Sequence, residues 1–134
     1  MQLDKLFLKE IKSIWEGARS RAYSLVNREM VLGYWEIGRR IFQEEQKSSK
    51  RAEYGKYLLR ELSSVLTREL DKSLDERELR RMRQFYHYFP MKDSLRPELT
   101  WTHYRLLLRV EDMSARSYYL NEAADHSWGT RHLE

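Results

Sequence analysis

The 134-residue sequence predicts an all-α, multi-helix domain with a helix-turn-helix, winged-helix-like core and one long central helix. Charged residues form 34% of the chain, whereas it holds only two prolines and five glycines, which favours helix throughout. Apolar residues recur at steps of three and four along most of the chain. One short turn near residue 72 separates two such helical patterns. At this length a single domain over residues 1–134 is expected.

The composition also limits the class of protein. There are no cysteines, which excludes disulfides and thiolate metal sites and favours a reducing, cytoplasmic compartment. No apolar run reaches the length of a membrane span, so no membrane partner is expected. The net charge is +4, and between residues 39 and 109 there are 17 Lys/Arg against 11 Asp/Glu. A basic middle segment is compatible with a polyanionic partner.

The first third of the sequence predicts a short amphipathic helix to about Trp15, ended or bent at Gly17, and then a long helix over residues 18–46. The long helix carries one apolar stripe of Tyr23, Val26, Met30, Tyr34, Ile37 and Ile41. A second stripe holds Val31, Trp35 and Phe42, roughly 120° away. Two apolar faces indicate either the central helix of the domain or a homodimer contact through the second stripe.

Two glycines lie inside this long helix, where glycine weakens helical structure. We expect Gly33 and Gly38 to allow the close approach of a neighbouring helix. A polar loop should follow over residues 46–52. The next helix is predicted over residues 53–70, with an inward face made of Leu58, Leu62, Val65 and Leu66.

The segment after residue 70 has clear boundaries. Residues 71–73 form the predicted turn, and Asp75 is a predicted N-cap with Glu78 three positions later, as in a capping box. This helix should end at Phe89, because Pro90 disfavours helical geometry at the residue before it.

The last third predicts a loop over residues 91–99 and then two shorter helices. Thr100 or Thr102 can cap the first of them. Asp112 and Ser114 mark the start of the second, over residues 115–125. Residues 128–134 resemble the first turn of a further element, so the sequence predicts a piece of a longer protein.

The helix after Asp75 has two distinct faces on a helical wheel. Its apolar face is formed by Leu79, Met82, Phe85, Tyr86 and Phe89. The opposite face holds Arg77, Arg80, Arg81, Gln84 and Tyr88, and its edges hold Arg83 and His87. In a helix-turn-helix the second helix enters the major groove, and arginine pairs bidentately with guanine or phosphate.

We therefore predict a duplex-DNA interface centred on this helix. The groove-facing candidates are Arg77, Arg80, Arg81 and Gln84. The candidates for backbone contacts are Lys56, Arg60, Arg68 and Arg83. The alternative is a solvated helix face on which Glu76 and Glu78 neutralise Arg80 and Arg81. Because the first turn is acidic, contact through residues 80–84 is favoured over contact through the helix tip.

No catalytic pattern occurs. The four histidines, His87, His103, His126 and His132, lack metal-site spacing, and we expect each to be a surface or capping residue. Neither a glycine-rich phosphate loop nor a serine nucleophile elbow is present. The chain is therefore predicted to be non-catalytic, without cofactor, metal or small-molecule substrate.

Four segments are similar to a known family: YWEIGRR (34–40), RAEYGKYLLRELSSVLTREL (51–70), ERELRRMRQFYHYFP (76–90) and residues 99–134. They resemble the N-terminal domain of the YhcG family, bacterial proteins in which a helical domain of unknown function precedes a PDDEXK-type nuclease domain. The resemblance implies a DNA-binding, helix-turn-helix-like module that delivers a C-terminal nuclease, itself absent from this chain. Asp75 stands where a serine cap is expected in the family.

Two other interpretations remain open. The chain could be a dimerisation or protein-interaction module with no direct nucleic-acid contact, as the two-faced long helix suggests. RNA could also replace duplex DNA, because the sequence does not distinguish the two.

Overall fold

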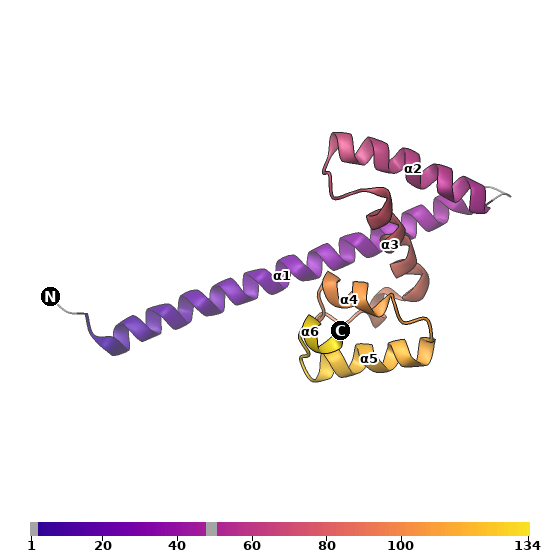
Figure 1. Ribbon diagram of the computed structural model, residues 1–134. Coiled ribbons are helices and arrows are strands. Elements are labelled where there is room, and N and C mark those ends of the chain that lie inside the picture. The colour runs from indigo at the N-terminus through magenta and orange to yellow at the C-terminus, as the bar shows by residue number, and fades with distance from the viewer. Residues whose placement is uncertain (1–2, 48–50) are drawn as a thin grey trace.

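The computed structural model describes residues 3–47 and 51–134, and every regular element within these ranges is helical (Figure 1). The elements are α1 (Lys5–Glu45), α2 (Arg51–Glu69), α3 (Glu76–Tyr88), the 3-10 turn η1 (Lys92–Ser94), α4 (Trp101–Leu107), α5 (Met113–Asp125) and α6 (Thr130–Leu133). The predicted all-α, multi-helix class is confirmed. The described ranges hold no strand that could form a wing, and the helix-turn-helix core stays a prediction.

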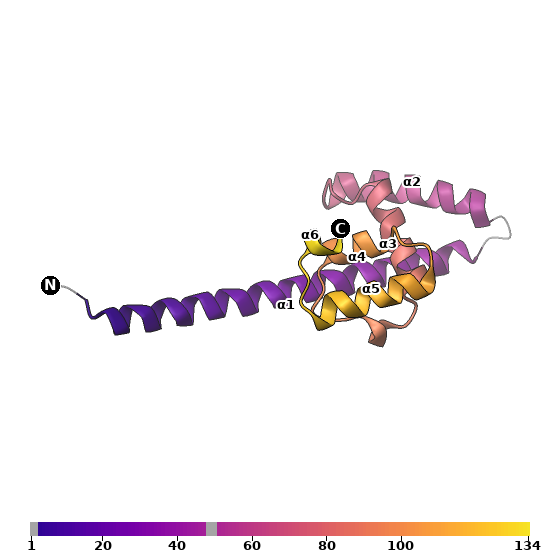
Figure 2. The ribbon, with the colours of Figure 1, turned by 60° about the horizontal axis from the view of Figure 1, so that its bottom comes forward.

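One helix of 41 residues replaces the two helices expected in the first third of the chain. The predicted break at Gly17 is wrong, because a lone glycine costs a helix only about 1 kcal/mol and its neighbours favour propagation. Asp4 caps the helix by accepting a hydrogen bond from the Leu6 N–H. In Figures 1 and 2 the N-terminal half of α1 projects from the molecule, whereas the other helices gather around its C-terminal half.

Helix α3 crosses the C-terminal half of α1 at Gly38. A Cβ atom at this position would overlap the backbone carbonyl of Met82, so only glycine permits this crossing. The close approach predicted for Gly38 is confirmed. The same prediction for Gly33 is wrong, because no atom of the described residues lies within 4 Å of a Cβ built there.

The core forms where α1, α3 and α4 meet. Val31 and Trp35 of α1 pack with aromatic residues of α3 and α4, and the Trp35 indole N–H donates to the Phe89 carbonyl at 2.7 Å. Phe42 is half-buried beside the Tyr86 ring. The second apolar stripe of the long helix is thus used within the chain. The homodimer contact predicted for this stripe stays a prediction, and Phe42 is the stripe's one half-buried member.

Helix α2 covers a second, smaller cluster that contains Ile41, Leu79 and Met82. Its deepest side chain is Leu59, which was not among the predicted inward residues. Leu58, Leu62 and Leu66 are half-buried, as predicted for the inward face, whereas Val65 is exposed and was wrongly assigned to it. The buried face of α2 is rotated toward Leu59 relative to the prediction.

The predicted caps are largely confirmed. Asp75 accepts from the Glu78 N–H at 2.9 Å, Thr100 caps α4 together with His103, and Asp112 caps α5. The reciprocal half of the Asp75 capping box is absent, because the Glu78 carboxylate instead accepts from the Trp101 indole N–H at 2.7 Å. Helix α3 ends at Tyr88, one residue before the predicted end.

Candidate nucleic-acid interface

Helix α3 buries the face that the helical wheel predicted. Leu79, Met82 and Phe85 have no solvent exposure, and Phe89, its C-cap residue, is also buried. The residues of α3 that are exposed are Arg77, Arg80 and His87. These three positions follow one side of the helix at steps of three and seven, which places their side chains on a common line.

The two other groove-facing candidates are engaged within the chain. Arg81 pairs with Glu78 at 3.0 Å, and the same carboxylate is held by Trp101. Gln84 donates its amide N–H to the Leu108 carbonyl at 3.3 Å. Both side chains are half-buried, so contact with a nucleic acid would require them to leave these partners.

Arg83 forms an ion pair that joins α3 to α1, and α2 packs against it. Its guanidinium lies 2.8 Å from the Glu45 carboxylate at the end of α1, and the Glu45 side chain is only 11% exposed. Gly55 of α2 lies directly against this pair, and a Cβ at Gly55 would come within 3.2 Å of the Glu45 carboxyl carbon. Arg83 is therefore positioned mainly to hold the fold together.

The structure brings part of the predicted site together around a hollow of about 450 Å³. Its lining residues are Phe42, Glu45, Arg80, Arg83, Gln84, His87 and Tyr88. His87 is a site residue that the helical wheel left at an edge. Its signal in the sequence was its position three residues after Gln84. Arg77 and Arg81 are not among the described lining residues.

The candidates on α2 form a separate group. Lys56, Arg60 and Arg68 are exposed. At about 100° per residue, Lys56 lies roughly 60° and Arg60 roughly 100° from Leu59 around α2, and only Arg68 lies opposite it. In the part of the chain that the structure describes, they lie outside the hollow on α3. Contacts from these residues would therefore be additional to those from α3.

Arg80 pairs with Glu76 at 3.3 Å, as the solvated-face alternative expected. Both side chains are about half-exposed. Exposed ion pairs of this kind contribute about 0–1 kcal/mol, so a phosphate can replace the carboxylate at little cost. Arg80 is consequently the most available cation beside the hollow.

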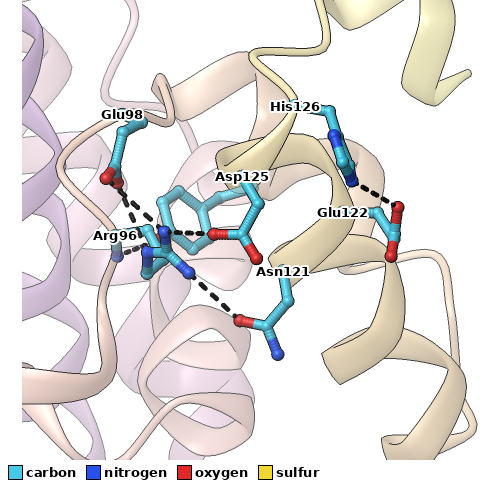
Figure 3. A network of polar contacts seen from close by, with 7 residues as sticks. Arg96, Glu98, Asn121, Glu122, Asp125 and His126 are labelled. Carbon is cyan, nitrogen blue, oxygen red and sulfur yellow. Dashed lines mark hydrogen bonds and ion pairs between the residues drawn. The ribbon is translucent and has the colours of Figure 1, made fainter.

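A second polar cluster surrounds Arg96, in the loop before α4 (Figure 3). Its guanidinium lies 2.8 Å from Asp125 and also contacts Glu98 and Asn121, which raises the pKa of Arg96. The Arg96 backbone N–H donates to the Tyr104 hydroxyl, whose pKa burial raises to about 12. Two carboxylates and one amide oxygen accept hydrogen bonds from this guanidinium. The cluster therefore ties the loop to α4 and α5 and is not an open site.

The histidines behave mostly as predicted. His103 is buried and caps α4: its Nδ1 accepts from the Thr100 N–H at 3.0 Å, so Nε2 carries the proton that it donates to the Trp128 carbonyl. His87, His126 and His132 are exposed. Among the described residues no group of three side chains could hold a metal ion.

None of the described helices combines the length and the apolar character needed to cross a bilayer.

These observations define the chain as an all-helical module whose candidate site is a cationic helix beside a shallow hollow. It belongs to the DUF1016 N-terminal domain family, whose profile matches residues 10–134. It is also 30% identical over 151 residues to Putative nuclease YhcG of Escherichia coli (strain K12). The match covers 89% of this chain and 40% of that protein, so the chain spans less than half the length of this relative. No solved structure matches it. The resemblance found in the sequence is confirmed.

Proposed function

We propose that the chain is a non-catalytic DNA-binding module that delivers a downstream PDDEXK-type nuclease domain to duplex DNA. The observation that carries the proposal is the line of exposed Arg77, Arg80 and His87 on α3. The name of the Escherichia coli relative, a nuclease, supports the association with a nuclease domain. In this proposal α2 and α3 are the two helices of the helix-turn-helix, and α3 is the recognition helix.

The partners of each side chain rank the candidate contacts. Arg77 and Arg80 come first, because both are exposed and Arg80 is paired only at the surface. Lys56, Arg60 and Arg68 of α2 are suited to backbone phosphates, which set affinity and salt dependence. Arg81, Arg83 and Gln84 come last, because their contacts within the chain would have to break.

A salt-dependent titration with duplex DNA tests the proposal. Replacement of both leading cations, Arg77→Gln with Arg80→Gln, should weaken binding at least about ten-fold and reduce the salt slope by about one per lost phosphate contact. The matched control is Arg109→Gln with Arg131→Gln, which removes the same charge from two exposed arginines elsewhere. Unchanged affinity in the α3 variant, or an equal loss in the control, would contradict the site. Competition with structured RNA at matched ionic strength decides between the two nucleic acids.

A protein-interaction role is the second candidate function. It is favoured by the large apolar side chains that α1 exposes over its N-terminal half. The two functions are compatible, because DNA-binding domains of the helix-turn-helix class often act as dimers.

A further inference from the structure

The N-terminal half of α1 carries an unusual amount of exposed apolar surface. Over residues 3–30, eleven large hydrophobic side chains are between 38% and 69% exposed. They are Leu3, Leu6, Phe7, Leu8, Ile11, Ile14, Trp15, Tyr23, Leu25, Val26 and Met30. Contiguous apolar surface of this extent marks an interaction site.

Part of this apolar surface forms a regular stripe, whereas Leu3, Leu6, Tyr23 and Met30 lie elsewhere around the helix. Steps of three and four connect the six residues that we call the α1 stripe: Leu8, Ile11, Trp15, Ala18, Ala22 and Leu25. Phe7 and Ile14 border it, whereas Ser13, Ser20 and Asn27 fall on the other side of the helix. This is the a and d pattern of a coiled coil. The next position in the pattern is Glu29, so the stripe ends just before Val31 enters the core.

The α1 stripe points away from the domain of its own chain. At 100° per residue its mean direction lies roughly 160° from that of Val31, Trp35 and Gly38, the side on which the core packs. Figures 1 and 2 agree that this half of α1 projects clear of the other helices. A partner can therefore approach the stripe without meeting the domain.

We propose that a second copy of this chain packs its own α1 stripe against this one, as a parallel two-helix coiled coil. The size of the surface fits such a dimer. With large side chains about half-exposed, the stripe and its apolar borders offer on the order of 700 Å² per copy, close to the ~800 Å² per partner of a stable interface. The contact differs from one through Val31, Trp35 and Phe42, which pack within the chain.

The charges along the stripe select the parallel orientation. One edge of the stripe carries Lys5, Lys12 and Arg19 at steps of seven residues. In an antiparallel pair this edge would meet itself and place like charges opposite each other. In a parallel pair it meets the other edge, so that Lys12 lies over Phe7 and Arg19 over Ile14 of the second copy. The aliphatic stems of the basic side chains can then cover apolar surface while their charges remain in water.

The oligomeric state of the chain tests the proposal. Sedimentation at about 100 µM should give twice the monomer mass for the wild type, whereas Trp15→Glu with Leu25→Glu should be monomeric, with at least ten-fold weaker association. The control, Ser13→Glu with Ser20→Glu, adds the same charge on the opposite side of the same helix and should remain dimeric. Circular dichroism confirms that each variant is folded.

A folded wild type that stays monomeric would overturn the proposal and would assign the stripe to another segment or another protein. Equal association of the wild type and the stripe variant would overturn it as well. Neither outcome depends on DNA, so the dimer and the proposed function can fail independently.

Because the sequence contains no cysteine, single cysteines can determine the orientation. Leu8→Cys should form a disulfide-linked dimer in a parallel pair, because identical positions face each other. Ser20→Cys, on the opposite side of the helix, should not. Cross-linking of Leu8→Cys only to a Leu25→Cys copy would show an antiparallel pair and overturn the orientation.

Discussion

The two halves of α1 contain similar side chains in opposite environments. Trp35, in the C-terminal half, is 5% exposed, whereas Trp15, in the N-terminal half, is 64% exposed. The helix is continuous through both, so local helix-forming preference does not distinguish them. The difference arises because α2, α3 and α4 pack on one half only. An apolar stripe on a helix therefore predicts a contact, but not whether the contact lies within the chain.

The largest expected difference in stability is between substitutions of the two tryptophans. Trp35→Ala should lower the free energy of unfolding by about 4–5 kcal/mol, because it leaves a cavity and an unpaired Phe89 carbonyl. Trp15→Ala should change the stability of the monomer by less than about 0.5 kcal/mol. Urea denaturation at low protein concentration measures both. Similar losses in the two variants would show that the N-terminal half is also packed within the chain.

The glycines give the next largest difference. Gly38→Ala should destabilise the fold by about 3 kcal/mol, because the new methyl group forces α3 away from α1. Gly17→Ala should stabilise it by about 0.5–1 kcal/mol through helix propensity, since only the mobile end of the Arg21 side chain must shift. Thermal unfolding provides the measurement. A harmless Gly38→Ala would mean that the two helices do not cross this closely.

Tyr104, in the core, should make the stability of the packed half depend on high pH. The pKa of Tyr104 is raised to about 12 by burial, against about 10 in the unfolded chain. The contribution of Tyr104 to the free energy of unfolding should therefore be fully present below pH 10. It should fall by about 2–3 kcal/mol as the pH rises to 12, because over this range the unfolded state loses the phenol proton more readily than the folded state. Tyr104→Phe should remove this part of the decline.

The smallest expected difference in stability is between substitutions of two glutamates of α1. Glu45→Ala should cost about 2 kcal/mol, less than a fully buried pair, because Arg83 keeps 29% exposure and can be partly solvated. Glu16→Ala, on the exposed half, should change stability by no more than about 0.5 kcal/mol. Chemical denaturation at neutral pH compares them. A loss of DNA binding in Glu45→Ala without loss of stability would instead make Arg83 part of the interface.

The sequence was most informative where local rules decide the structure. The cap at Asp75 and the apolar face of α3 followed from neighbouring residues alone. The hydrogen bonds of Glu78 and Gln84 did not follow from neighbouring residues, because their partners, Trp101 and Leu108, lie more than twenty positions away. The assumed break at Gly17 also divided the α1 stripe and concealed its heptad spacing.

Amide hydrogen exchange along α1 at two protein concentrations tests the central contrast most directly. Amides in residues 31–45 should be protected to the same degree at both concentrations, because their helix is held by the core. Amides in residues 6–29 should gain protection only at the concentration where the chain dimerises. Equal protection of both halves in the dilute monomer, or no gain for residues 6–29 at any concentration, would contradict the account.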